Sequence, residues 1–302
     1  MVENIKILNL NKNIELDLSA LHTPDYVIES VLWRPVDSDI VTTQLYSHIG
    51  EHIDVINYKG RIIEISGAII AKSATEMNNR KIFLNSFVNP THDLRLLYKD
   101  YSIDFKLQNS ILYSSQWNEN NEVLCKFKIN GFAAFPLFSN VTDKHVLTNE
   151  TEPMFHFPLI MSRVPANPGG IVFGKIRNDT LVSIFNTGDV ITGMRIIVTF
   201  LQNSRGFTLT NVDTQEKLSV VTTFYDTEIL EINTNRNKRD ITITQFKDGV
   251  PYTSPYLQHM SNDSVWLQIA LGHNNFVYSV DTGIVNVEIF FNESFFEVQR
   301  WD

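Results

Sequence analysis

Short runs in which apolar and polar residues alternate recur along most of the chain, separated by Asn, Asp, Gly and Ser. Alternation with a period of two, rich in β-branched and aromatic residues, is typical of strands that bury one face. In the first half we expect two β-hairpins and one further strand: 53–58 with 61–70, 94–98 with 101–107, and 123–129. Gly60 can adopt the positive φ of a tight turn, which favours the first of these hairpins.

One segment of the first half follows a helical period instead. Ser73 precedes Glu76 by three residues, which is the spacing of an N-terminal capping box. Apolar or long side chains then recur at helical intervals: Met77, Arg80, Leu84, Phe87 and Val88. The pattern predicts one amphipathic helix of about four turns, which ends at Asn89-Pro90.

The second half predicts strands only. Nine short strands are expected: 171–185, 192–201, 207–211, 218–221, 228–233, 240–245, 265–270, 275–280 and 284–291. Such a series is typical of a sandwich or jelly roll. Half of the ten prolines fall within residues 136–168, which indicates a domain boundary. We therefore expect a first domain over 1–138, a linker over 139–158 and a second domain over 159–302.

Composition and charge narrow the class of protein. Hydrophobic residues make up 43% and charged residues 20% of the 302 residues, which excludes a disordered or low-complexity chain. Asp and Glu outnumber Lys and Arg by 34 to 25, so the net charge of −9 disfavours general binding to nucleic acid or anionic lipid. No run reaches the roughly 18 apolar residues of a membrane span, and the first residues lack a secretion signal. We expect synthesis in the cytosol and no membrane insertion.

The strongest candidate for metal chemistry is His48-Ile49-Gly50-Glu51-His52, which matches the H-x-x-E-H pattern of inverted zinc peptidases. In those enzymes the two histidines share a helix face and hold zinc, and the glutamate is the base. Gly50 lies inside the segment and 53–56 predicts a strand, so the imidazoles are not expected to share a face. A solvated or packed loop is the favoured interpretation. Cys125 is the one cysteine, which excludes an intramolecular disulfide, and we expect it to be a small buried hydrophobe.

The other candidates also favour a structural interpretation. No G-x-S-x-G, P-loop or G-x-G-x-x-G occurs, and the remaining histidines are scattered: His22, His92, His145, His156, His259 and His273. A solvated strand edge explains three neighbouring acidic residues: Asp226, Glu228 and Glu231. Arg236–Arg239 predicts a solvated hairpin tip. Trp266 or Tyr252 could stack on a sugar, although we expect Trp266 to be a buried strand aromatic. We assign no catalytic, cofactor-binding or metal-binding residue, and we expect no cofactor and no enzymatic activity.

Four segments of the second half follow one another in the order of known motifs: Phe185–Ile196 (N-x-G-D-x-x-T-G), Phe207–Glu216 (a hinge-type turn), Glu228–Thr234 (D-x-L-x-I-N-T) and Trp266–Phe276 (F-x-L-x-x-G-x-N-x-F). This order resembles phage distal tail proteins, the Dit or siphovirus-type tail component family. Segments of the first half resemble the N-terminal barrel of that family: Tyr58–Gly67, the helix around Arg80, the hairpin around Lys99-Asp100, and Phe127–Ile129 followed by Phe135–Phe138. The resemblance covers nearly the whole chain, with weak matches over 1–50 and 139–160.

The resemblance implies a mainly β protein, in which an N-terminal β-barrel or sandwich carries one α-helix and a galectin-like β-sandwich follows. It implies a structural component of the distal tail or baseplate hub, located at the virion tail tip after assembly in the host cytoplasm. Its first domain would form a homo-hexameric ring that joins the tail tube protein to the tail tip protein. The second domain holds a receptor-binding protein in some members.

A ring of this kind closes by heterologous contacts, so we expect two complementary surfaces on the first domain that include apolar or strand-edge groups. The acidic balance suits a water-filled channel that does not retard DNA, because a wall that attracted phosphate would hold the genome back. Two alternatives stay open: a carbohydrate-binding module that contacts the host wall, and a zinc peptidase.

Overall fold

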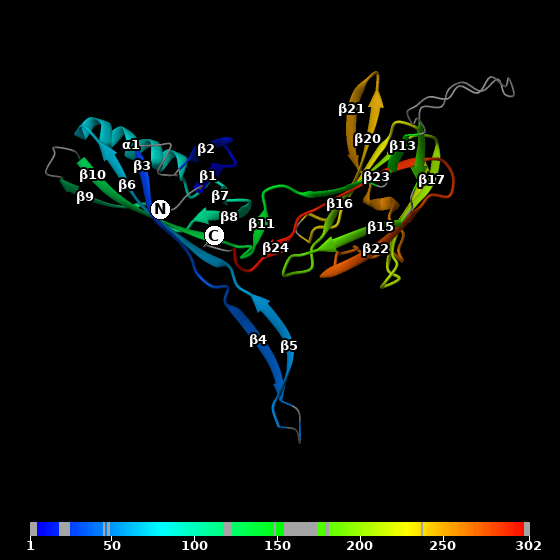
Figure 1. Cartoon of the computed structure of the whole chain (residues 1–302), viewed down its shortest axis with the longest axis horizontal. Coiled ribbons are helices and arrows are strands. Elements are labelled where there is room, and N and C mark those ends of the chain that lie inside the picture. Colours follow the sequence, from blue (N-terminus) through cyan, green and yellow to red (C-terminus); the bar gives the residue numbers. More distant parts are fainter. Residues whose placement is uncertain are drawn as a thin grey trace, which may run out of the picture. The chain divides into compact units, whose positions relative to one another are not determined.

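The computed structural model describes residues 5–17, 25–44, 46, 49–117, 123–147, 149–153, 174–178, 181–236 and 238–298. The chain divides into two compact units, Met1–Thr142 with Ser294–Asp302, and Asp143–Glu293. Strands dominate both units and the described residues contain one α-helix, so the predicted mainly β class is confirmed (Figure 1). Along the chain, the second unit is an insertion into the first.

The described part of the first unit contains a ten-stranded sheet. Seven strands follow one another in the order β2 (Ile14–Asp17), β1 (Ile5–Asn9), β7 (Leu94–Tyr98), β8 (Tyr101–Leu107), β10 (Val123–Ala133), β6 (Arg61–Ala71) and β3 (Tyr26–Trp33). β9 (Leu112–Trp117) pairs with β10, and β11 (Phe138–Asn140) pairs with β8 and with β24 (Ser294–Phe295). Alternate side chains of these strands meet in one core, which includes Ile7, Ile65 and Phe127.

The predicted helix and the second predicted hairpin are both present. α1 spans Ala74–Phe87, and the Ser73 hydroxyl accepts a hydrogen bond from the Glu76 N–H at 3.2 Å. The helix buries Met77, Leu84 and Phe87. β7 and β8 pair antiparallel, and Lys99 in the turn between them has a φ of +52°. Among the described residues, no helix is long and apolar enough to cross a membrane.

The first predicted hairpin is wrong. β5 (Glu51–Tyr58) pairs with β4 (Ser38–Gln44), whereas β6 pairs with β3 on one edge and with β10 on the other. Both edges of β6 are therefore occupied, and β5 cannot pair with it. Gly60, between β5 and β6, does not have a positive φ. Glycine is needed there because a Cβ atom would lie 2.2 Å from the Phe132 ring.

In the described part of the second unit, two larger sheets share one core. One sheet has the order β12 (Lys144–Leu147), β23 (Val285–Phe291), β16 (Met194–Phe200), β19 (Ile229–Asn233), β20 (Asp240–Lys247) and β21 (Val250–Pro255). The other has the order β15 (Leu181–Asn186), β22 (Gly272–Ser279), β17 (Ser204–Asn211) and β18 (Lys217–Phe224). β13 (Asn149–Pro153) pairs with β14 (Gly174–Asn178). Phe200 and Phe224 stack between the two larger sheets, with ring centroids 4.1 Å apart.

Two predicted strands of this unit are also wrong. The expected strand over 171–185 contains two strands, β14 and β15, which belong to different sheets. Residues 265–270 form no strand, and Ile269 makes only an isolated bridge with Thr192. The alternation in this segment comes from Leu267 and Ile269, which are buried in the core without a ladder of strand hydrogen bonds. β21 and the short 3-10 helix η1 (Leu257–His259) precede this segment, and the sequence pattern predicted neither.

The observed division of the chain differs from the expected one in two places. The expected linker over 139–158 contains β11, β12 and β13, while 154–158 lie outside the described residues. The end of the expected second domain joins the first unit: β24 pairs with β11, Trp33 Nε1 donates to Glu297 Oε2 at 2.8 Å, and Val298 is buried. Prolines mark turns, whereas membership of a sheet depends on pairing between residues distant in sequence, which a local pattern does not encode.

Candidate functional site

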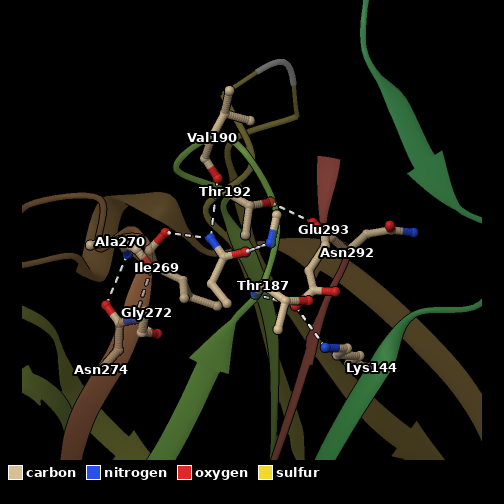
Figure 2. A network of polar contacts seen from close by, with 12 residues as sticks. Lys144, Thr187, Val190, Thr192, Ile269, Ala270, Gly272, Asn274, Asn292 and Glu293 are labelled. Atoms are coloured by element: carbon tan, nitrogen blue, oxygen red, sulfur yellow. Dashed lines mark hydrogen bonds and ion pairs between the residues drawn. The ribbon is translucent and has the colours of Figure 1, made fainter. Parts of the chain in front are cut away.

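Two of the motif segments, Phe185–Ile196 and Trp266–Phe276, meet in the second unit around a network of polar contacts (Figure 2). Thr192 and Ile269 join them through reciprocal backbone N–H···O bonds of 3.1 and 2.8 Å. β15 ends and β22 begins there, because Asn186 lies opposite Gly272 in their register. The network therefore holds together the end of β15, the loop after it and the start of β22.

Asn186 closes the loop that follows β15. The residue is 3% exposed, and its Nδ2 donates to the carbonyl oxygens of Val190 at 3.1 Å and Ile269 at 3.4 Å. Its Oδ1 accepts from the Gly188 N–H at 2.9 Å, which is an Asx-type turn. A buried amide whose donor and acceptor are both satisfied stabilises one loop conformation.

Asn274 holds the opposite loop in a similar way. Its Oδ1 accepts from the Ala270 N–H at 2.8 Å, and its Nδ2 donates to the carbonyl oxygens of Ala270 and Gly272 at 2.8 and 3.0 Å. Gly272 has a φ of +80°, a left-handed conformation that favours glycine. The chain therefore enters β22 through a fixed turn (Figure 2).

Glu293 ties the end of the inserted unit to the same loop. Its side chain is 2% exposed, and Oε1 accepts from Lys144 Nζ at 2.6 Å and from the Thr187 N–H at 2.7 Å. The Thr192 hydroxyl donates to the neighbouring carbonyl oxygen of Asn292 at 2.7 Å. Burial acts to raise the pKa of Glu293, but the hydrogen bonds from Lys144 and Thr187 outweigh it and hold the pKa below its ordinary value of 4.5.

This network has a structural role, and we call it the clamp: Asn186, Thr187, Thr192, Asn274 and Glu293 with the groups they bind, which include Gly272 and Lys144. Its polar groups bind one another and the backbone, and the described residues hold no group of three His, Cys, Asp or Glu that could bind a metal ion. Directly next to the network, Phe185 and His273 face each other with ring centroids 4.6 Å apart, and Phe185 is 49% exposed. A fixed backbone behind exposed aromatic side chains pre-organises a surface for recognition.

A second candidate surface is the hairpin of β4 and β5 in the first unit. Among the described strands, these two pair only with each other, and Figure 1 shows them beyond the ends of β3 and β6. Every residue of both strands is exposed. An isolated two-stranded sheet is at best marginally stable in water, so this hairpin lacks the packing that such an element ordinarily needs.

A β-bulge decides which side chains of this hairpin share a face. Ile40 lies opposite Ile56, but the register shifts between the pairs Val41–Val55 and Thr42–Ile53, so that β5 contains Asp54 as an extra residue. An extra residue reverses the phase of alternation beyond it. Ile53 therefore lies on the face of Ile56, and not on the face of Val55.

The hairpin consequently has one face that is richer in large apolar side chains than the other. One side, which we call the apolar hairpin face, carries side chains that are 46–55% exposed: Ile40, Ile53, Ile56 and Tyr58. The other side carries the exposed pair Val41 and Val55 among polar residues, and Thr43 Oγ1 donates there to Asp54. A row of large exposed apolar side chains indicates a surface that another molecule covers.

The H-x-x-E-H segment does not form a helix in its described part. Gly50 has a φ of +106°, and Glu51 and His52 begin β5, while His48 lies outside the described residues. Thr42 Oγ1 donates to Glu51 Oε2 at 2.5 Å, which places this carboxylate on the hairpin surface. The helix that such a zinc site needs is therefore absent from the described residues 49–52.

The interpretation of the acidic residues is wrong for Glu228. This residue is 6% exposed, and its carboxylate accepts from Gln245 Nε2 at 2.7 Å and from the Tyr225 N–H at 2.9 Å. Asp226 is exposed and Glu231 is half-buried, so only part of the cluster is a solvated edge. The sequence pattern did not reveal that a backbone N–H of the turn after β18, that of Tyr225, donates to the Glu228 carboxylate.

The remaining candidates lie apart from the polar network. Cys125 is buried, as predicted. Arg236, Lys238 and Arg239 are exposed between β19 and β20, and Asn237 lies outside the described residues. Trp266 is half-buried beneath the Arg239 guanidinium at 5.9 Å and belongs to no strand, which corrects its expected role as a buried strand aromatic. Tyr252 on β21 is 60% exposed.

The clamp residues Asn186, Asn274 and Glu293 were not singled out from the sequence. Asn186 and Asn274 lie within motif segments, so the sequence indicated that these positions matter. It did not indicate which hydrogen bonds their amides form. Glu293 carries no local signal, because its partners Lys144 and Thr187 lie 149 and 106 residues away.

Comparison with known proteins bears on both units. Residues 187–295 match the family described as siphovirus-type tail component, C-terminal domain. Among the curated proteins, none matches the chain. The SPP1 Dit (gp 19.1) protein, described as a paradigm of the hub adsorption apparatus in phages that infect Gram-positive bacteria, has a similar structure. Its TM-score is 0.63 at 15% identity, over 97% of this chain and 100% of that chain. A chain of the phage P2 baseplate in its activated conformation with Ca gives a TM-score of 0.50 at 14% identity, over 97% and 98% of the two chains.

The two structural likenesses show that the fold is shared over nearly the whole chain. The family match contains three of the four motif segments in full and most of the first. It also contains the clamp residues Thr187, Asn274 and Glu293. Residues 187–295 thus match the siphovirus-type tail component family, which confirms the predicted resemblance for this part of the chain, and the likeness in fold to SPP1 Dit covers 97% of the chain.

Proposed function

We propose that this chain is the hub of a phage tail tip, in which six copies of the first unit form a ring between the tail tube and the tail tip protein. The match of 187–295 to a tail component family supports a structural role in the tail. The observation that carries the assembly itself is the apolar hairpin face of the first unit. The inserted second unit is then the part that holds adsorption proteins, and no catalytic role is proposed.

The hairpin suits assembly because its own chain buries only about half of the surface of its apolar side chains. Ile40 and Ile56 form a cross-strand pair and are 55% and 46% exposed. Burial of apolar surface contributes about 25 cal/mol per Å², so four such side chains supply a useful part of the free energy of association. Tyr58, at the base, also contacts the Phe296 ring with centroids 5.0 Å apart, which fixes one end of the hairpin to the first unit.

A protruding element and a separate receiving surface on every copy give a heterologous contact. Such contacts close into a ring when the rotation between neighbours divides a full turn, as it does for six copies. Between Ser38 and Tyr58 the charged residues are Asp39, Glu51 and Asp54, with no Lys or Arg. Within the described part of the chain, only Asp39 of these three has a cation beside it, Lys59 Nζ at 2.7 Å. We expect the receiving surface to combine apolar groups with positive charge, because opposite potentials fix the register of a contact.

The test is the mass of the purified full-length chain, followed by negative-stain images. We expect the wild type to form a ring of six, and the double variant Ile40→Asp/Ile56→Asp to remain monomeric at the same concentration. Val41→Asp/Val55→Asp is the matched control, because it makes the same apolar-to-acidic change in an exposed cross-strand pair on the other side of the same hairpin. Both variants alter exposed residues, so their circular dichroism should equal that of the wild type. A monomeric wild type, or an equal loss of rings in both variants, contradicts the proposal.

A further inference from the structure

The outward face of the four-stranded sheet in the second unit differs from the apolar hairpin face in its chemistry. Side chains of β15 and β22 alternate, so that Ile184 and Phe276 enter the core while their neighbours point outward. Opposite one another on the outward face lie three pairs: Phe185 with His273, Ser183 with Asn275, and Leu181 with Val277. The outward positions of these two strands carry no Lys, Arg, Asp or Glu.

Phe185 is an aromatic platform in this face. It is 49% exposed although it is flanked by the buried residues Ile184 and Asn186. The His273 ring supports it from the next strand, with centroids 4.6 Å apart and an angle of 56° between the ring planes. Because Asn186 and Gly272 belong to the clamp, the backbone on both sides of this pair is held in one conformation. The exposed ring can therefore take part in binding at little further cost in entropy.

Uncharged hydrogen-bonding groups continue the face beyond the two rings. Ser183 Oγ donates to Asn275 Oδ1 at 2.8 Å, which orients the Asn275 amide. The Asn275 N–H donates to Asp213 Oδ2 at 3.3 Å, so one carboxylate lies at the border of the face. On β17 and β18, Thr208 and Ser219 form a further hydroxyl pair at 2.8 Å.

We infer that the face around Phe185 on β15 and β22 binds a neutral pyranose. One side of such a sugar is a set of C–H groups that packs on an aromatic ring, and its hydroxyls exchange hydrogen bonds with amides, hydroxyls and imidazoles. The groups beside Phe185 are of these kinds. An anionic ligand would find no cation at the outward positions of these strands, and would lose hydration without compensation. This inference is independent of ring formation, because it uses residues of the second unit alone.

The experiment uses the full-length chain and an array of soluble neutral oligosaccharides built from glucose, galactose and N-acetylhexosamines. A second arm uses purified bacterial cell-wall polysaccharide, to separate free sugars from a wall polymer as the source of the ligand. We expect saturation-transfer NMR to show binding of at least one neutral sugar, with Phe185→Ala weakening it by about tenfold or more. Phe185→Trp should retain binding, since it keeps the stacking surface.

Val221→Ala is the matched control. Val221 is also an exposed apolar residue of this sheet, on β18 at the opposite end of the strand order, and it is 62% exposed. We expect this variant to bind like the wild type, and thermal unfolding to show that all variants are folded. If neither arm shows binding, or if Phe185→Ala binds as well as Val221→Ala, the inference is wrong. A wild type that binds sugar as a monomer supports this inference while contradicting the proposed ring.

Discussion

Single residues in the second unit connect segments that are far apart in the sequence. Glu293 accepts hydrogen bonds from Lys144, near the start of the unit, and from Thr187, in the loop after β15. A buried carboxylate with such partners is stabilising only while it is ionised, since protonation removes an acceptor from the Lys144 ammonium. Residue chemistry of this kind was not predictable, because the spacing of residues in the sequence does not show which groups meet.

Stability should therefore depend on pH through Glu293. Its pKa is lower in the folded chain than its ordinary value of 4.5, so its contribution is complete above that value and is lost as the pH falls through the folded pKa. We expect Glu293→Gln to lower the free energy of unfolding by about 1–3 kcal/mol at pH 7. Urea titrations at pH 7 and below pH 4 should show this difference shrinking on acidification. A difference that is the same at both pH values assigns the effect to packing.

Elements differ in how far local sequence determines them. α1 was predicted from its capping box and its period, and the hairpin of β7 and β8 from its turn, because the determining contacts lie within a few residues. The pairing of β5 was predicted incorrectly, because Lys59-Gly60 has the composition of a turn although β6 already has β3 and β10 as partners. The bulge at Asp54, which creates the apolar hairpin face, likewise has no recognisable local signal.

The capping contact of α1 can be tested alone. In Ser73→Ala the Glu76 N–H loses its side-chain acceptor, and we expect a loss of about 1 kcal/mol in the free energy of unfolding. Thr75→Ala lies in the same first turn, is exposed, and serves as the control because alanine favours the helix interior. Urea unfolding that reports both variants as equally stable would show that the cap contributes little here.

At the scale of the whole molecule, the chain leaves the first unit after β11 and returns to it at β24. These two strands are neighbours, with Phe138 opposite Phe295. On the other side of the crossing, Asn292 Nδ2 donates to Asp143 Oδ1 at 2.9 Å. The proline-rich stretch indicated the first crossing approximately, but nothing in the pattern near residue 293 indicated the second, because short strands look alike whichever sheet they join.

Removal of residues 294–302 should consequently damage the first unit. Arg61 Nη2 donates to the Phe296 carbonyl oxygen at 2.5 Å, and Val298 belongs to the core of that unit. We expect the truncated chain to lose native protection from hydrogen exchange in β6 and β11, whereas β16 and β22 stay protected. Loss of protection confined to the second unit would contradict the division of the chain at these residues.

The two crossing points bear on how such a gene can change. The chain leaves and re-enters the first unit through two paired strands, β11 and β24. Residues 143–293 could therefore be exchanged for another domain whose two ends lie close together. Recombination at two short stretches of DNA would replace the inserted module without altering the host module's fold. An exchange of this kind would leave the pairing of β11 with β24, and with it the first unit, unchanged.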